Sequence, residues 1–231
     1  ALVPEEEGPL SEGCFVAPSF MGYAELPSYA NWLLDKPRTV FFEFLRDVLK
    51  YLQWQGLASP DRPWLLKSPN YNGQELMLRQ VFPAVRFVVA NRAPLQTLAS
   101  MCKLVHCFRQ AFGKAEVDNA LIIEGNYRSM DAHLANRRAL LAEEPAERRD
   151  VQDIVGALPE TLPQVFAHAG MDLSKEASKR MFDWNARNSM HKLGEFKYSL
   201  TDAGLEEAVV RERMADYFKH LEMLDAKARI T

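Results

Sequence analysis

The chain has 231 residues, of which 48% are hydrophobic and 26% are charged, and this composition is typical of a soluble globular domain with a sizeable core. A net charge of −3 argues against general affinity for nucleic acid or acidic membranes. No apolar run approaches the ~20 residues of a membrane span. The three cysteines fit neither a zinc-ligand spacing nor a disulfide framework, so no metal site is expected. No signal peptide is recognised in the sequence, which does not specify a localisation, and the cytoplasm is the expectation.

The first quarter of the chain is predicted to become helical after an irregular start. Residues 1–26 are rich in Pro, Gly and Glu and are expected to form a loop. A short helix is predicted at 27–34 and a stronger one at 39–55, followed by a break at 58–63. The apolar residues of the stronger helix recur at helical spacing, which predicts one buried face. These residues are Phe41, Phe44 or Leu45, Val48 and Leu52.

The next segment alternates strands and helices. A short apolar run predicts a strand at 64–66, and a helix is predicted at 72–81. The β-branched run at 85–90 suits a strand buried on both faces of a parallel sheet. Pro94 then opens a helix that extends to about Phe112. This order predicts an α/β fold in which a short parallel sheet is flanked by helices.

The remainder is predicted to be mostly helical. Helices are expected at 117–147, 159–169, 174–192 and 205–221, and the helix at 205–221 is expected to turn Val209 and Tyr217 inward. A further strand is expected near 150–155. Because no repeat, low-complexity tract or linker interrupts the sequence, residues 1–231 are expected to form one domain.

Two cationic residues stand where predicted strands end. Lys67 follows the first strand and Arg92 follows the second, and open α/β sheets bind ligands at the carboxyl ends of their strands. A forked guanidinium beside a mobile ammonium group suits a phosphate or another anion. Ser100, two turns into the next helix and on the same face as Thr97, adds a hydroxyl donor. The alternative is that Lys67 and Arg92 end strands in solvent or pair with carboxylates.

These segments resemble the sulfotransferases that use 3′-phosphoadenosine 5′-phosphosulfate (PAPS), especially the broad group often found in bacteria. The family pattern is a Trp-x-Leu-Lys-Ser-Pro strand end, a Phe-Pro-x-Ala turn, a hydrophobic strand, then Arg-Asp-Pro and a Ser eight residues after the Arg. Trp64–Pro69, Phe82–Pro83, Arg92 and Ser100 stand at these places. Further landmarks follow in the family's order: Pro4–Glu7, Pro27–Leu33, Leu52–Gln55, Phe166–Gly170, Asp183–Asn185, Tyr198–Leu200 and Gly204–Leu205.

The resemblance implies a P-loop-type three-layer sandwich that transfers a sulfuryl group from PAPS, without a metal. The acceptor would be a hydroxyl or amine of a small molecule, a lipid or a carbohydrate, and neither nucleic acid nor a membrane span is implied. Arg92 and Ser100 match the residues that bind the donor's 3′-phosphate in the family. Lys67 is expected at the leaving oxygen, and Lys197, beside Tyr198, is expected to reach a donor phosphate. The oligomeric state stays open.

Sulfuryl transfer also needs a base for the acceptor hydroxyl. The carboxylates of Glu5–Glu7 are candidates, and Glu6 is taken as the representative. The alternative for this segment is a solvated run of charges. His106, two turns beyond Ser100, is a further candidate base.

The sequence departs from the family pattern in several places. Ala93 replaces the Asp of Arg-Asp-Pro, which removes a helix cap worth about 1 kcal/mol. Tyr71 stands where many relatives have a His, and the Tyr expected near residue 153 is not evident. The glycine-rich loop that binds the 5′-phosphosulfate belongs upstream of Ala1. We therefore expect these 231 residues to be the larger, C-terminal part of the domain and to be inactive alone.

Two other functional classes stay open at this point. A P-loop kinase-like phosphotransferase would require a Gly-Lys-Ser/Thr loop end and metal-binding carboxylates. A non-catalytic, sulfotransferase-like binding module would be consistent with the departures at Ala93 and Tyr71. Binding of adenosine 3′,5′-bisphosphate would distinguish a protein that binds the sulfuryl donor from one that does not.

Overall fold

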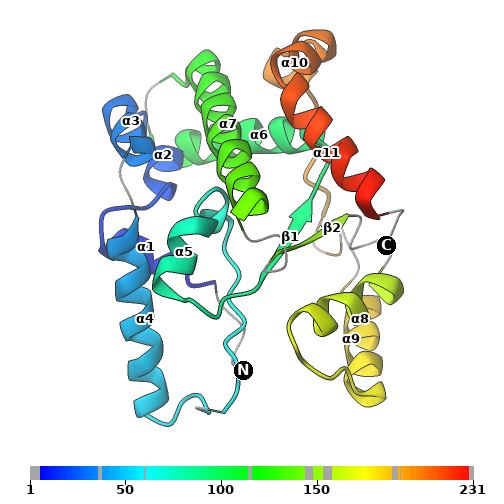
Figure 1. Cartoon of the computed structure of the whole chain (residues 1–231). Helices are drawn as coiled ribbons and strands as arrows, with labels where there is room; N and C mark the ends of the chain where they lie inside the picture. The colour runs from blue at the N-terminus through cyan, green and yellow to red at the C-terminus, as the bar shows by residue number, and fades with distance from the viewer. Residues whose placement is uncertain are drawn as a thin grey trace. The chain divides into compact units, whose positions relative to one another are not determined.

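The structure, a computed structural model, describes residues 6–35, 38–59, 61–113, 116–143, 148–152, 158–188, 192 and 194–228. The chain is a mostly helical α/β protein, as Figure 1 shows in chain order. It divides into two compact units. The first unit comprises Ala1–Val85 with Met101–Pro145, and the second comprises Arg86–Ser100 with Ala146–Thr231. Each unit is described in turn.

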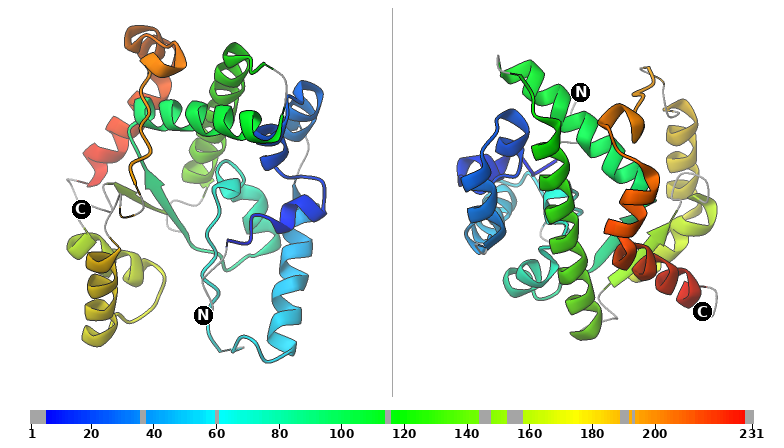
Figure 2. Two further views of the ribbon diagram at one scale, coloured as in Figure 1. Left: turned by 180° about the vertical axis from the view of Figure 1, so that it is seen from behind. Right: turned by 90° about the horizontal axis from the view of Figure 1, so that it is seen from above.

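The first unit is helical in the part that the structure describes. Its elements are α1 (Leu10–Gly13), α2 (Ser19–Tyr23), α3 (Pro27–Asp35), α4 (Thr39–Trp54), the 3-10 turn η1 (Pro69–Tyr71), α5 (Glu75–Val81), the later part of α6 (Pro94–Phe112) and α7 (Asn119–Glu143). Helix α4 packs against α5, and α5 packs against α7, as the views of Figure 2 also show.

Helix α4 supplies much of the core of the first unit. Phe41, Phe42 and Leu45 are almost completely buried, and Leu49 is buried one turn later. The helix predicted at 39–55 is therefore confirmed, together with its buried positions Phe41 and Leu45. Phe44, the alternative to Leu45, is 42% exposed.

Residues 6–26 contain two short helices that the sequence analysis missed. Helix α1 follows Pro9 and helix α2 follows Pro18. Proline is tolerated at a helix start because its fixed φ suits the helix and its missing N–H would have no partner there. Pro9 and Pro18 therefore each precede a short helix, in a segment that was expected to form only a loop.

The second unit holds a pair of strands. β1 (Phe87–Asn91) runs parallel to β2 (Arg148–Gln152), with Phe87 opposite Arg148 and Asn91 opposite Gln152. The strand predicted at 85–90 is confirmed with a shift of one or two residues. The strand predicted near 150–155 is confirmed at 148–152, and residues 153–155 lie outside the described part.

Two predictions about the sheet were wrong. Residues 64–66 form no strand, since this stretch has no ladder of backbone hydrogen bonds to a described neighbour, and a strand exists only through such a ladder. β1 is not buried on both faces. Phe87, Val89 and Asn91 are buried whereas Val88 is 41% exposed, because one face of the pleated strand packs inward.

The rest of the second unit is helical. Its elements are the first part of α6, α8 (Leu158–His168), α9 (Lys175–Arg187), the 3-10 turn η3 (Thr201–Ala203), α10 (Glu207–Arg213) and α11 (Ala215–Ala228). The helix predicted at 205–221 breaks at Met214, which has non-helical backbone angles. Val210 and Met214 are buried, whereas Val209, which was expected to face inward, is 56% exposed. None of the described helices is both long and apolar enough to cross a bilayer.

Candidate functional site

The turn that carries Lys67 and Tyr71 meets the acidic segment near the start of the chain. The Lys67 ammonium donates to the Glu6 carboxylate, and the Tyr71 hydroxyl donates to the Glu7 carboxylate. The candidate cation and a candidate base, 61 positions apart in sequence, are thus in contact. Glu5, the third carboxylate of the run, lies outside the described residues.

Local hydrogen bonds shape this turn. Ser68 caps η1 by accepting a hydrogen bond from the Asn70 N–H at 3.2 Å. Gly8 lies against this turn so closely that a Cβ there would be 2.9 Å from the Ser68 hydroxyl. The Ser11 hydroxyl donates to the Gly8 carbonyl at 2.6 Å and accepts from the Asn70 amide at 3.5 Å. The acidic segment is therefore fixed by backbone proximity as well as by its charged side chains.

The two carboxylate contacts differ in their surroundings. The Lys67 side chain is 75% exposed, so its ion pair is screened by water and contributes little to folding stability. Burial, and then the bond to Glu7, raise the pKa of Tyr71 above its ordinary value. Tyr71 therefore keeps its proton at neutral pH and acts as a hydrogen-bond donor to Glu7. The first pair is available to exchange partners with a ligand, and the second is a more protected contact.

The second unit contains the other predicted anion-binding residues. Arg92 directly follows β1, and its guanidinium donates to the Tyr198 hydroxyl at 3.3 Å. Lys197, the neighbour of Tyr198, is exposed and lies 3.6 Å from the Glu195 carboxylate. The structure therefore brings the C-terminal loop to Arg92 through Tyr198. The sequence analysis used Tyr198 only as a family landmark, and its position beside Lys197 was the signal that could have singled it out.

The helix after Arg92 begins as predicted. α6 starts at Pro94 and carries Ser100 two turns further on. The Thr97 hydroxyl donates to the Ala93 carbonyl at 3.2 Å, so Thr97 is engaged with the start of its own helix. Lys67 and Glu6 belong to the first unit, whereas Arg92, Ser100 and Lys197 belong to the second.

His106, the other candidate base, is engaged elsewhere. Its ring nitrogen Nδ1 lies 2.9 Å from the Asn119 side-chain oxygen, in an exposed position. The contact that joins Lys67 to a carboxylate is made by Glu6 instead. Glu6 is accordingly the better placed of the two candidates in the first unit.

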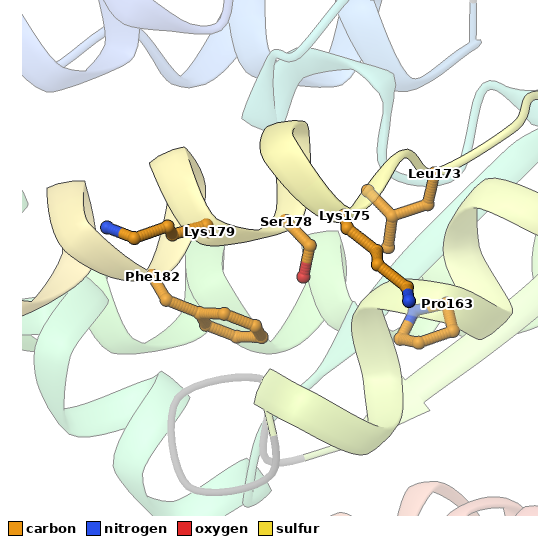
Figure 3. A pocket seen from close by; sticks show the side chains of 6 residues that line it. All are labelled: Pro163, Leu173, Lys175, Ser178, Lys179 and Phe182. Atoms are coloured by element: carbon orange, nitrogen blue, oxygen red, sulfur yellow. The ribbon is translucent and has the colours of Figure 1, made fainter.

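One pocket of the second unit is lined by none of these residues. It has a volume of about 470 Å³ and is formed by α8, α9 and the loop between them (Figure 3). Its lining residues are Pro163, Leu173, Lys175, Ser178, Lys179 and Phe182. The Lys179 ammonium is 2.6 Å from the Asp183 carboxylate and is therefore already paired within α9. Within the described ranges, no cluster of three or more His, Cys, Asp or Glu side chains could hold a metal ion.

Comparison with known proteins relates the chain to solved structures. Sulfotransferase STF1 from Mycobacterium tuberculosis H37Rv is 27% identical, with a TM-score of 0.75 over 92% of this chain and 55% of that one. Sulfotransferase STF9 from Mycobacterium avium is 21% identical, with a TM-score of 0.81 over 94% of this chain and 56% of that one. This chain therefore spans just over half the length of either structure. No curated protein sequence matches it.

The family comparison covers most of the sequence. The model described as the sulfotransferase family matches residues 1–176, a range that includes the acidic segment, the Lys67 turn, β1 and Arg92. The resemblance noted in the sequence is thereby confirmed, and the chain belongs to the sulfotransferase family.

Proposed function

We propose that this protein is a PAPS-dependent sulfotransferase, with residues 1–231 belonging to one sulfotransferase-like domain. Membership of the family supports sulfuryl transfer as the reaction class. The parallel strands β1 and β2, together with the similarity to two solved sulfotransferases, support a P-loop-type three-layer sandwich. The choice of donor comes from the family, and the residues below are those we expect to use it.

The observation that carries the proposal is the contact between Glu6 and Lys67. In-line sulfuryl transfer needs a base for the acceptor hydroxyl and a cation at the leaving oxygen. We assign the first role to Glu6 and the second to Lys67. The acceptor oxygen forms a bond to sulfur as its proton passes to the Glu6 carboxylate. The bond from sulfur to the bridging oxygen breaks, and Lys67 stabilises the charge that remains on that oxygen.

The ion pair between these residues brings the two groups together before ligands bind. Because Lys67 and Glu6 are both substantially exposed, each can exchange its partner for a ligand group at little cost in folding stability. Glu7 is the alternative base, since it lies beside Glu6 and accepts a hydrogen bond from Tyr71.

We assign the donor's 3′-phosphate to the second unit. Arg92 is exposed at the end of β1 and offers a guanidinium fork suited to phosphate oxygens. Ser100 would add a hydroxyl donor from α6, and Lys197 a further positive charge. The observed bond from Arg92 to Tyr198 supports a contribution of the C-terminal loop to this site. The acceptor remains one of three classes: a small molecule, a lipid or a carbohydrate.

The test is to measure donor-product binding and transfer with the full protein. Adenosine 3′,5′-bisphosphate should bind in calorimetry much more tightly than adenosine 5′-monophosphate, which lacks the 3′-phosphate. Labelled sulfate should move from PAPS to an acceptor in a panel of phenols, sterols, lipids and sugars. Equal affinity for the two nucleotides would contradict the donor site. Selective binding without transfer to any acceptor class would favour the non-catalytic binding module.

A further inference from the structure

A cluster of buried charged and polar side chains lies behind the turn that carries Lys67 and Tyr71. Arg38, at the start of α4, is 7% exposed, and Arg137, on α7, is 5% exposed. Glu75, the first residue of α5, is 3% exposed. His133 lies one turn before Arg137 on α7. All of these residues belong to the first unit.

Both arginines bind the segment that follows Lys67. The Arg38 guanidinium donates to the Asn70 carbonyl at 3.3 Å. The Arg137 guanidinium donates to the Asn72 side-chain oxygen at 2.8 Å, and its Nε is 3.9 Å from the Glu75 carboxylate. Asn70 and Asn72 are the immediate neighbours of Tyr71. The two cations therefore hold the turn from two different helices, one on each side of the residue that contacts Glu7.

His133 of α7 packs against the same segment at Gly73. Gly73 has a φ of +72°, and a Cβ on it would be 2.7 Å from the His133 ring and 2.9 Å from its Cα. No larger residue fits between the turn and α7 at this position without displacement. The chain from Ser68 to Gly73 is consequently confined by α4 through Arg38 and by α7 through Arg137 and His133.

The cost of this arrangement indicates that it serves more than folding. Burial lowers the pKa of Arg38 to about 10, so the side chain stays charged at neutral pH. Its described hydrogen bond is to an uncharged carbonyl, and its Nε has no partner among the described residues. Buried charges are expensive, and an apolar residue of similar size is often neutral or stabilising in their place. A role in folding alone therefore does not account for an arginine here.

We propose that Arg38 and Arg137 are positioning residues that hold the Ser68–Gly73 segment, and through it keep Lys67 and Tyr71 opposite Glu6 and Glu7. The inference rests on the proposed function in so far as the positioned residues are the catalytic ones. Neither arginine is assigned a contact with substrate. Each acts through the backbone or side chain of the turn.

The first experiment measures the turn directly and needs no catalytic activity. Hydrogen exchange, followed by mass spectrometry on the full protein, is compared for the native sequence, Arg38→Met and Arg137→Met. Peptides that report the amides of residues 70–73 should exchange about tenfold faster in either variant, since each loses one hydrogen bond to the turn. Peptides from the interiors of α4 and α7 should stay as protected as in the native protein. Arg46→Met is the matched control, because Arg46 lies on α4, is partly exposed and pairs with the adjacent Asp47.

The second experiment links the turn to the reaction. In the labelled-sulfate assay, Arg38→Met should lower kcat at least about tenfold, because small displacements of catalytic groups are costly. The KM for the donor should change less than threefold, because the donor's 3′-phosphate is assigned to the second unit. Arg38→Lys, which keeps a charged donor, should restore part of the lost kcat.

The outcomes are distinct. Native exchange rates at residues 70–73 in both methionine variants would overturn the proposal, as would a uniform loss of protection across the first unit, which would indicate a purely structural role. Faster exchange confined to the turn with kcat unchanged would overturn the link to catalysis. If the native protein transfers no sulfate, the proposed function fails, and the exchange experiment still decides whether the arginines hold the turn.

Discussion

The two units hold their candidate residues in different ways. In the first, the turn with Lys67 and Tyr71 is in contact with the acidic segment and with Ser11 of α1. It is also bound by Arg38 at the start of α4 and by Arg137 of α7. In the second, the exposed Arg92 donates a hydrogen bond to the Tyr198 hydroxyl at 3.3 Å.

The side chains around the Lys67 turn are therefore held in place before a ligand binds. The Arg92 side chain, by contrast, must be ordered by the ligand itself. A long, exposed arginine loses rotamer freedom when it binds phosphate, and that loss subtracts from its affinity. The Lys67 turn has already been ordered during folding. Substitutions around that turn should therefore act at a distance, whereas those in the second unit should act mainly at the residue that is changed.

The largest effect is expected on the rate of sulfuryl transfer when Lys67, the proposed catalytic cation of the first unit, is replaced. Lys67→Met removes the charge assigned to the leaving oxygen, and loss of one such electrostatic group costs about 10²–10³-fold in rate. The labelled-sulfate assay should show this loss, while the affinity for adenosine 3′,5′-bisphosphate should fall by a smaller factor, because Arg92 still binds the 3′-phosphate. Lys50→Met, an exposed position on α4, is the control. Transfer within twofold of the native rate would remove Lys67 from the mechanism.

The next largest effect is expected on nucleotide binding when the exposed Arg92 of the second unit is replaced. Arg92→Ala should weaken binding of adenosine 3′,5′-bisphosphate by about 1.5–3 kcal/mol, the usual contribution of hydrogen bonds to a charged group. Calorimetry with the folded variant measures it. Arg211→Ala changes an arginine of the same unit that is paired with Glu207 on α10 and should have no effect. Unchanged affinity in Arg92→Ala would refute the phosphate assignment.

A pH experiment probes the polar cluster behind the ordered turn. Burial, and the charges of Arg137 and Arg38, lower the pKa of His133 to about 3 from an ordinary 6.5. Between these values the unfolded chain binds a proton at this position and the folded chain does not, so stability falls as the pH falls below 6.5. The loss from this group at pH 5 relative to pH 8 should be about 2 kcal/mol.

The measurement is the free energy of unfolding in urea at the two pH values. His133→Gln cannot titrate, so its stability should fall by about 2 kcal/mol less than that of the native protein between pH 8 and pH 5. His106→Gln, which removes an imidazole beside Asn119 in the same unit, is the comparison variant. A native pH dependence in His133→Gln would show that His133 is not held neutral in the folded state.

The smallest effect concerns Tyr198. Tyr198→Phe removes the hydroxyl that contacts Arg92 and should change bisphosphate binding by about 1 kcal/mol or less, the net value of one hydrogen bond. The same calorimetric titration detects it. A loss as large as that of Arg92→Ala would mean that the second unit, like the first, depends on a supporting residue, and the contrast between the units would not hold.

The helices and the cations were predictable from the sequence because their signals are local. The spacing of Phe41 and Leu45 predicted α4, and Pro94 marked the start of α6. Residues 64–66 had the composition of a strand, but pairing depends on a neighbour that composition cannot supply. The break at Met214 likewise leaves no local mark, and composition did not show that α10 buries Val210 rather than Val209.

The candidate site was predictable in its residue types and not in its contacts. Lys67, the Glu5–Glu7 run and Arg92 were each singled out by charge and position. The sequence could not show that Tyr71 reaches Glu7 or that Tyr198 reaches Arg92, since these contacts span 64 and 106 positions. Arg38 and Arg137 were missed altogether. From sequence alone, an arginine in or next to a helix is expected to be exposed to solvent, and only the tertiary structure shows that it is buried.

The contact between Glu6 and Lys67 also bears on the order in which the protein acquires its parts during synthesis. The two residues are 61 positions apart, so at typical elongation rates Glu6 is incorporated about 3–12 s before Lys67. Helix α4 lies between them and can form from local contacts within that interval. The acidic segment meanwhile has no cation to meet, and Gly8 has no Ser68 to pack against. The ion pair between Glu6 and Lys67 therefore forms late. Once it is present, the long-range contacts of the first unit have formed.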